Sequence, residues 1–485
     1  MMGDCDLKIF KNIIITIFTS AILFGESFHV SVLGSDETGN GSESNPFASI
    51  QLGLNTCADN DTVIVFAGTY VENINWPSTM SINLIGSGSF DCIIDGDSLD
   101  AVINMVEYPT ATIDTTTKII GFTIQNGMDI GDNGGGIRCI GAGPYLMDLI
   151  VRNNKSSRSG GGWTQSGGSG GGIFISESNP ILENLYLSGN IADAEGGGIY
   201  FQNSDPIIEN VTVVNNTASS AGGGIYCFGN TFSMNHVTIS GNYSPYVSGI
   251  FYDGTSFDMI NSIIWENTPN AVAITTANEQ LTISYSNIRG GWEGVGNIDS
   301  NPLFCSLGND AYTLAENSPC YGTGENGTYM GAHDIGCGPV WGGPIWHVDA
   351  LGSDQTADGS AFNPFLTIQK GILSCNAGDT VLVAAGNYFE NIFWPVTNGI
   401  VMIGSGAADC IIDGNQNGSV IRFDSENIDP SSIISGFKIK NGSFSNGGGI
   451  FCQNSSPTIM DVIITGNDAT NYGGGITLYY SEPII

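Results

Sequence analysis

Lysine and arginine would supply the base in an elimination reaction, and the sequence holds only 12 of them against 47 aspartates and glutamates. Such a base works beside carboxylates that hold calcium. Between residues 118 and 290 the candidates are Lys118, Arg138, Arg152, Lys155, Arg158 and Arg289. Arg152 and Lys155 flank a Gly/Ser-rich insertion, where a solvated turn is the simpler interpretation. These cations therefore do not predict a catalytic base.

Other catalytic patterns are also missing from the sequence. Neither clustered aspartate pairs nor a Gly-His-Gly segment for a hydrolase occurs, and there is no CxxC or zinc-ligand spacing. The segment GGSGGGI (167–173) lacks the Lys-Ser/Thr and the helix of a phosphate loop. The histidines show no pair or triad spacing: His29, His236, His333 and His347. We therefore expect no catalytic residue and no cofactor, and calcium binding stays open because carboxylates are abundant.

Aromatic residues have the spacing best suited to binding. Each follows the isoleucine that closes a glycine run, and the four are Phe174, Tyr200, Tyr226 and Phe251. If the isoleucines point inward, alternation along a strand turns these rings outward into one column. The column could stack on sugar rings, with Trp163 of the insertion (155–170) beside it. Alternatively, the rings could stack on one another and only stabilise the sheet.

The elements that must position this column follow from a repeat of 26 residues. The isoleucines Ile173, Ile199 and Ile225 are 26 residues apart, and Ile250 follows one residue early. Between them, segments such as DPIIENVTVVNN (205–216) alternate apolar and polar residues, as short half-buried strands do. A fixed period of this length is typical of a solenoid. Coils of a parallel β-helix, about 4.8 Å apart, fit better than propeller blades of about 40–45 residues.

One asparagine ends each repeat and predicts a buried ladder. An inward amide can bond backbone groups that a turn leaves unpaired, each of which would otherwise cost about 1–3 kcal/mol. The predicted ladder is Asn154, Asn190, Asn216, Asn242, Asn267, Asn441 and Asn467. A second column lies six residues earlier and comprises Asp148, Asn184, Asn210, His236, Asn261 and Asp461.

A larger repeat encloses the small one, because residues 28–77 return as residues 346–395 with an offset of 318. We expect a first domain over 28–341, with a cap helix within 46–57 and a cysteine-containing closing segment over 297–341. A linker (342–345) and a second, incomplete domain (346–485) follow. The last residues stop within a repeat unit, so we expect a truncated second copy.

The segments GSDETGNGSESNPFASIQ (34–51) and GDTVLVAAGNYFENI (378–392), followed by IDG and GF-containing strands, carry a family resemblance. They resemble the entry segment of secreted right-handed parallel β-helix proteins of the pectate-lyase-like superfamily. The GGGI and asparagine units resemble the repeats of bacterial polymorphic outer-membrane proteins. The resemblance implies an all-β, right-handed parallel β-helix. It says little about activity, since the superfamily mixes lyases, hydrolases, adhesins and proteins with no known reaction.

The N-terminus and the cysteines indicate export. Lys8 and Lys11 precede a short apolar stretch (13–24), which predicts a signal peptide over 1–27. The duplicated pairs Cys57–Cys92 and Cys375–Cys410 predict two disulfides. The closing segment allows one bridge among Cys305, Cys320 and Cys337. Three further cysteines are expected in the core: Cys139, Cys227 and Cys452.

The net charge of −35 repels nucleic acid, and no segment after the signal peptide predicts a membrane span. We expect a secreted or cell-surface protein that binds an extracellular polysaccharide or surface glycan, as an adhesin does, without cleaving it. Two alternatives remain: a polysaccharide lyase or glycoside hydrolase, and a structural stalk. The sequence does not predict the oligomeric state.

Overall fold

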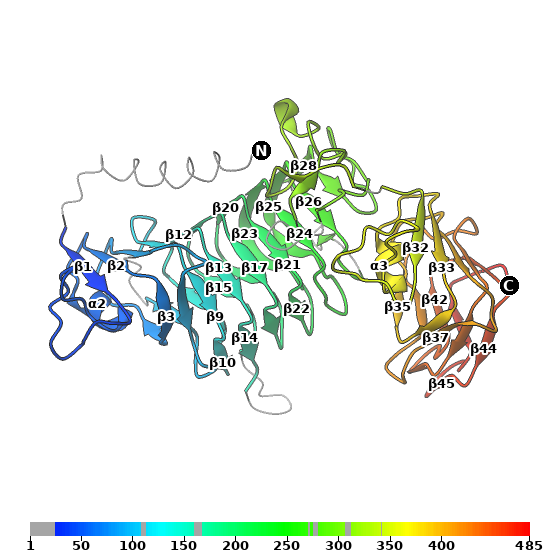
Figure 1. The fold of residues 1–485 in the computed structure, drawn as a ribbon, viewed down its shortest axis with the longest axis horizontal. Helices are drawn as coiled ribbons and strands as arrows, with labels where there is room; N and C mark the ends of the chain where they lie inside the picture. The colour runs from blue at the N-terminus through cyan, green and yellow to red at the C-terminus, as the bar shows by residue number, and fades with distance from the viewer. Residues whose placement is uncertain are drawn as a thin grey trace.

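The computed structural model describes residues 25–107, 113–159, 167–269, 272–274, 280–305, 312–340 and 342–485. Short strands stack in parallel register from coil to coil, so these residues form a parallel β-helix. Two groups of sheets lie end to end (Figure 1). We call β1 to β29 the first stack and β32 to β46 the second stack.

The first stack has three sheets. The largest contains β1 (Ser27–Val30), β2 (Thr62–Val65), β4 (Ile74–Asn75), β5 (Asn83–Gly86), β7 (Ile103–Val106), β8 (Lys118–Ile120), β11 (Ile137–Ile140), β12 (Tyr145–Met147), β15 (Ile173–Ser176), β16 (Ile181–Glu183), β19 (Ile199–Gln202), β20 (Ile207–Glu209), β23 (Ile225–Asn235), β25 (Ile250–Ile260), β27 (Val272–Ile274) and β28 (Gln280–Ser284). The nine-stranded sheet contains β3 (Gly68–Val71), β6 (Cys92–Asp95), β9 (Thr123–Gln125), β13 (Ile150–Arg152), β17 (Tyr186–Ser188), β21 (Thr212–Val214), β24 (Thr238–Ser240), β26 (Ile263–Trp265) and β29 (Asn287–Ile288). The third contains β10 (Met128–Ile130), β14 (Lys155–Ser157), β18 (Ile191–Ala192) and β22 (Thr217–Ala218).

The second stack repeats this arrangement with fewer strands. Its sheets are β32 (Ile345–Val348), β33 (Thr380–Val383), β36 (Val401–Gly404), β39 (Ile433–Ser435) and β43 (Thr458–Met460); β34 (Gly386–Tyr388), β37 (Cys410–Asp413), β40 (Lys438–Lys440) and β44 (Ile463–Thr465); β35 (Ile392–Phe393), β38 (Ile421–Phe423), β42 (Ile450–Gln453) and β46 (Ile476–Tyr479); and β41 (Ser443–Phe444) with β45 (Asp468–Ala469).

The 26-residue register is confirmed. Ile173 pairs with Ile199, Ile199 with Ile225, and Ile225 with Ile250, always in parallel strands. All four isoleucines are fully buried. They stack in one core column because each coil repeats the path of the coil before it.

A short helix closes the start of each stack, as the sequence predicts for the first. Helix α2 (Ile50–Thr56) buries Ile50 and Leu54 against the first coil, and α3 (Ile368–Leu373) does the same with Ile368 and Ile372. Solenoid ends need such covers because they expose core and unpaired backbone.

The asparagine ladder is present in the first stack. Asn216 Nδ2 donates to Asn242 Oδ1 (3.0 Å) and to the carbonyl of Leu187 (3.1 Å), while its Oδ1 accepts from Asn190 N (3.0 Å) and Nδ2 (2.9 Å). The same links connect Asn154 to Asn190 and Asn242 to Asn267.

Asn441 corrects the prediction for the second stack. It has φ 58° and its side chain donates to Asp413, at 2.8 Å, rather than to the ladder. The ladder position is Gly442, whose N–H donates to Asn467 Oδ1 at 2.8 Å. The prediction placed Asn441 one residue away from the inward position, which in this coil carries a glycine.

The second predicted column has a backbone role. Its residues, Asp148, Asn184, Asn210, His236, Asn261 and Asp461, all have φ between 50° and 55°. Asparagine and aspartate tolerate this left-handed conformation better than most residues. The column therefore marks the bend that ends one strand of every coil.

The closing segment of the first stack includes β30 (Leu314–Ala315), a 3-10 turn (Glu325–Gly327) and β31 (Ile335–Cys337). It lies back across the nine-stranded sheet, where Ala332 N donates to Thr238 Oγ1 (2.9 Å) and His333 Nε2 lies 2.9 Å from Thr212 Oγ1. A disulfide joins Cys305 to Cys337, and Cys320 is the thiol left over.

The other two predicted disulfides are wrong, since Cys57, Cys92, Cys375 and Cys410 are all free thiols. Cys57 Sγ lies 3.3 Å from the carbonyl of Gly53 within the helix, whereas Cys92 Sγ lies on another element, 3.6 Å from the carbonyl of Phe66. The second stack repeats this geometry: Cys375 Sγ lies near the carbonyl of Gly371 and Cys410 Sγ near that of Ala384, both at 3.4 Å.

Cys139, Cys227 and Cys452 are buried core thiols, as predicted. No helix in the described ranges is long and apolar enough to span a membrane.

Candidate functional site: a cleft between the two stacks

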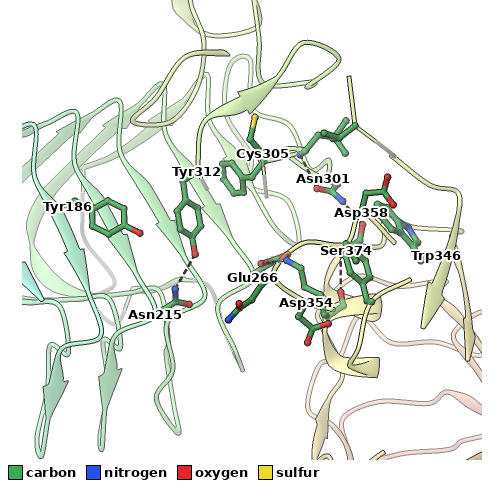
Figure 2. Close-up of a pocket in the computed structure, with 17 residues that line it drawn as sticks. Tyr186, Asn215, Glu266, Asn301, Cys305, Tyr312, Trp346, Asp354, Asp358 and Ser374 are labelled. Atoms are coloured by element: carbon green, nitrogen blue, oxygen red, sulfur yellow. Dashed lines mark hydrogen bonds and ion pairs between the residues drawn. The ribbon is translucent and has the colours of Figure 1, made fainter. Parts of the chain in front are cut away.

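A cleft of about 480 Å³ lies where the two stacks meet. Three parts of the chain line it: the outer face of the nine-stranded sheet, the closing segment, and the cap of the second stack. Figure 2 shows Tyr186, Asn215 and Tyr312 on the side of the first stack, and Trp346 and Asp358 on the side of the second.

Two tyrosines form the wall of the first stack. Tyr186 begins β17 and points outward, because the next residue, Leu187, is fully buried in the core. Tyr312 comes from the closing segment, and its hydroxyl accepts a hydrogen bond from Asn215 Nδ2 at 3.3 Å. Burial raises the pKa of both phenols, so their hydroxyl groups stay neutral and can both donate and accept.

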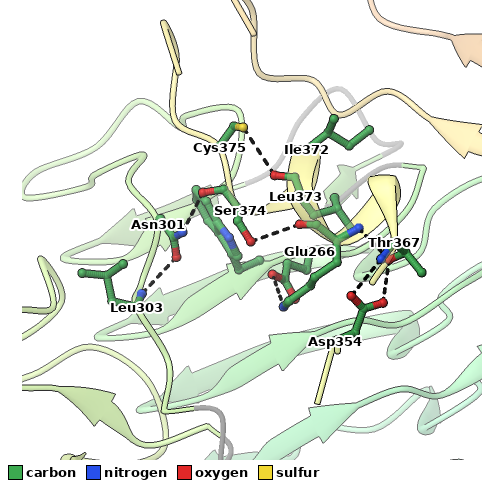
Figure 3. Close-up of polar contacts among 12 residues, drawn as sticks. Glu266, Asn301, Leu303, Asp354, Thr367, Ile372, Leu373, Ser374 and Cys375 are labelled. Atoms are coloured by element: carbon green, nitrogen blue, oxygen red, sulfur yellow. Dashed lines mark hydrogen bonds and ion pairs between the residues drawn. The ribbon is translucent and has the colours of Figure 1, made fainter. Parts of the chain in front are cut away.

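Carboxylates and aromatic rings form the wall of the second stack. Asp354 accepts from Leu366 N (2.8 Å), Thr367 N (3.0 Å) and Thr367 Oγ1 (2.6 Å), which fixes the loop at the start of α3 (Figure 3). Behind it, the ring of Trp346 stacks on Phe365 with centroids 5.9 Å apart.

Asp358 belongs to the same wall. One oxygen, Oδ1, accepts from Ser360 N at 3.0 Å and holds a tight turn. Residue 40 occupies the equivalent position in the first stack and is asparagine, whose Oδ1 accepts from Ser42 N at 3.1 Å. The turn therefore requires only the acceptor atom, and the charge of Asp358 is an addition in the cleft.

Direct contacts between the stacks hold the cleft in shape (Figure 3). Lys370 Nζ lies 2.9 and 3.1 Å from the two carboxylate oxygens of Glu266. A second contact comes from Asn301 of the closing segment. Its N–H donates to Asn376 Oδ1 (2.7 Å), and its Nδ2 donates to the carbonyl of Ser374 (2.6 Å).

The chemistry of the cleft suits recognition of a polar ligand with apolar faces. Rings of Tyr186 and Tyr312 offer apolar contact, and carboxylates and amides beside them accept and donate hydrogen bonds. Among the described residues, no group of three or more His, Cys, Asp or Glu side chains is placed to hold a metal ion.

The predicted aromatic column is present, but its rings stack on one another. Neighbouring centroids from Phe174 to Tyr200, Tyr226 and Phe251 lie 5.2, 5.0 and 4.7 Å apart, with planes within 13° of parallel. Phe174 is only 4% exposed. The inner ring faces are therefore occupied, which leaves ring edges and the two hydroxyl groups for any ligand. Trp163 lies outside the described residues.

Arg138 continues this column, since it pairs in register with Phe174. Its Nη1 lies 2.9 Å from Asp132 and 4.0 Å from Asp129. Burial, despite the opposing effect of Arg138, raises the pKa of Asp129 to about 6. Sequence reasoning noted Arg138 as a cation but missed the two carboxylates, which reach it from the neighbouring strand β10 and the turn after it.

Sequence reasoning also missed the cleft. Its lining residues come from segments up to 188 positions apart, from Tyr186 to Ser374, and share no motif or period. The available signal was the 318-residue duplication, which makes Asp354 and Lys370 parts of a second cap that must meet the end of the first stack.

No protein-family model matches the chain, and no curated protein matches its sequence. Among solved structures it is similar to pectin methylesterase PemA from Erwinia chrysanthemi, at 11% identity and a TM-score of 0.28, over 55% of this chain and 90% of that one. It is also similar to pectate lyase Pel9A, at 12% identity and a TM-score of 0.25, over 64% and 96%. A lacto-N-biosidase from Eubacterium ramulus matches at 10% identity and a TM-score of 0.19, over 95% and 68%. Such values carry no argument about activity.

Proposed function

We propose that this protein binds an extracellular polysaccharide or surface glycan without cleaving it. One observation supports this above all: the half-buried rings of Tyr186 and Tyr312 border a cleft that also contains carboxylates and amides. Sugars present apolar C–H faces and hydroxyl groups together, which this combination of side chains accommodates.

The location and domain organisation belong to the same proposal. A signal peptide over 1–27 would export the chain, and the Cys305–Cys337 disulfide is of the kind that persists outside the cytosol. We also infer two copies of one domain, 28–341 and 346–485, joined at 342–345. The equivalent caps α2 and α3 support this inference.

The aromatic column is proposed as a secondary contact surface. Since Phe174, Tyr200, Tyr226 and Phe251 occupy each other's faces, a glycan would meet ring edges and the hydroxyls of Tyr200 and Tyr226. Trp163, from the insertion, is part of the same proposal.

Binding to a neutral hexasaccharide, such as a β-linked glucose hexamer, tests the proposal by calorimetry. Tyr186→Ala and Tyr312→Ala would each remove about 60 Å² of ring contact, which corresponds to roughly tenfold weaker binding. Phe90→Ala is the matched control, because Phe90 is 70% exposed and position 408, its equivalent in the second stack, already carries alanine. Unchanged affinity in both tyrosine variants would exclude the cleft as the site.

The Arg138 group supports a second candidate, a polysaccharide lyase or hydrolase. A carboxyl with a pKa of about 6 beside an arginine could transfer a proton near neutral pH. Incubation with pectin, alginate and neutral glycans would reveal unsaturated products by ultraviolet absorbance, or new reducing ends. Products that Asp129→Asn abolishes would replace the binding proposal with this one.

A further inference from the structure

The lining of the cleft carries more negative than positive side chains. Three carboxylates line it, from Glu266, Asp354 and Asp358. Among the described residues of its lining, Lys370 is the only lysine or arginine, and both oxygens of Glu266 already hold it.

Arg289, which bonds the end of α3, does not compensate for this charge. Arg289 is 5% exposed and directs its guanidinium to the carbonyl oxygens of Ile372 and Cys375, at 3.0 and 3.4 Å, at the end of α3. In the part of the chain that the structure describes, neither Asp354 nor Asp358 forms an ion pair with a lysine or arginine.

We propose, on the basis of the proposed function, that the cleft binds saccharides with protonated amino groups most tightly. Neutral saccharides bind less tightly, and uronate polymers bind least. A uronate would bring its own carboxylate against these acids in a partly desolvated space. An ammonium group would instead meet the carboxylate of Asp358, of which the turn engages Oδ1, while the tyrosine rings contact the sugar face.

The magnitude follows from Coulomb's law. Charges about 7 Å apart at an effective dielectric constant near 40 change affinity roughly tenfold in either direction. Because the cleft is open to solvent on one side, salt should screen the preference, and at about 1 M the Debye length falls to roughly 3 Å.

The test uses three hexasaccharides with the full-length protein: a glucosamine hexamer at pH 6, a neutral glucose hexamer and a galacturonate hexamer. We expect affinities in that order, with roughly tenfold steps at 50 mM salt that shrink at 1 M. Asp358→Asn should weaken glucosamine binding severalfold and change binding of the neutral hexamer much less, because asparagine keeps an acceptor oxygen but removes the charge. The variant keeps its turn, because Asn40 already forms the same turn in the first stack.

Asp97→Asn is the matched control. Asp97 is exposed on the first coils of the first stack, and its φ of 49° suits asparagine. If galacturonate binds as tightly as the neutral hexamer, the selectivity is wrong although the binding function stands. If no hexamer binds, the proposed function itself fails. If Asp97→Asn reduces glucosamine binding as much as Asp358→Asn does, the effect comes from net charge and the proposal is overturned.

Discussion

Arg289 of the first stack donates a hydrogen bond from Nη2 to the carbonyl oxygen of Ile372, 3.0 Å away in the last turn of α3 in the second stack. Its Nη1 donates to the carbonyl of Leu373 beside it. The last carbonyls of a helix have no partner within the helix and favour a cation. A single side chain of one stack thus completes the cap of the other, and its partners Leu373 and Cys375 flank Ser374 of the cleft lining.

Replacing Arg289 should uncouple the two stacks. Arg289→Met keeps much of the side-chain volume but removes the guanidinium donor from the carbonyls of Leu373 and Cys375 at the end of α3, at a cost of about 3 kcal/mol. Scanning calorimetry should show one unfolding transition split into two, with the second stack unfolding first. Arg152→Met is the control, because Arg152 lies in the middle of the first stack and its Nε donates to Gln125 Oε1 within that stack. A single transition in Arg289→Met would contradict the coupling.

What the sequence could predict depended on repetition. Ile199, Ile225 and their equivalents recur because every coil must fill the same core position, so the 26-residue period predicts the core column. Asn441 shows the limit: one glycine at the inward position shifts the apparent motif by a residue. The prediction of a Cys57–Cys92 disulfide was wrong because the duplication shows only that both cysteines recur at the same separation. It does not show which elements face each other in the fold.

The cleft was beyond a sequence prediction for a physical reason. Tyr312 and Asp358 line one cleft only because the closing segment lies back on the nine-stranded sheet and the second cap docks at its end. Neither event leaves a periodic pattern. The Arg138 group was similarly hidden, since Asp129 lies in β10 and Asp132 in the turn after it, and the equivalent strand of the second stack, β41, contains Phe444 instead.

The asparagine ladder should be the most sensitive polar element of the first stack. Asn216→Ala removes the acceptor of two donors, the backbone N–H and the Nδ2 group of Asn190, in a site with no solvent exposure. At about 1–3 kcal/mol for each unsatisfied group, the expected loss of unfolding free energy is about 2–6 kcal/mol. Denaturant titration measures it.

Asn55→Ala is the comparison for this experiment. Asn55 is exposed on α2, where alanine is the better helix former, so its replacement should change stability by less than about 1 kcal/mol. Similar losses in both variants would show that the ladder contributes no more than a surface amide.

The Cys305–Cys337 disulfide should hold the closing segment against the nine-stranded sheet. It closes a loop of 32 residues, for which the chain-entropy model gives about 3–4 kcal/mol. Replacing both cysteines by serine should lower the unfolding free energy by that amount and weaken binding in the cleft, because Tyr312 belongs to the same segment. Cys320→Ser is the control, because it replaces a buried free thiol of the same segment, which accepts from Asn287 Nδ2, by a hydroxyl that can also accept, and breaks no covalent bond. Full affinity in the double variant would show that the segment stays in place without the bond.

Glu390 should make the cap of the second stack sensitive to pH. Its carboxylate accepts from Ile368 N and Gln369 N, both at 2.9 Å, and Asp354 lies near it. Burial raises its pKa from 4.5 to about 7, and Asp354 adds to the rise, so the folded state holds a proton that the unfolded state releases. The resulting stabilisation is present in full below pH 4.5 and is lost as the pH rises to about 7.

Glu390→Gln removes this titration, so the unfolding free energy of the native chain relative to the variant should fall by about 2–3 kcal/mol from pH 4.5 to pH 7. Denaturant titrations at half-unit intervals measure the difference. Glu72 is the matched site, since it accepts from Ile50 N and Gln51 N at 2.8 and 2.9 Å in the first cap, and burial also raises its pKa. Glu72→Gln should therefore give the same sign with a smaller amplitude, because the pKa of Glu72 is raised less. A native-minus-variant difference for Glu390 that stays flat, or that grows with pH, would mean that this carboxylate is ionised in the folded cap throughout the range.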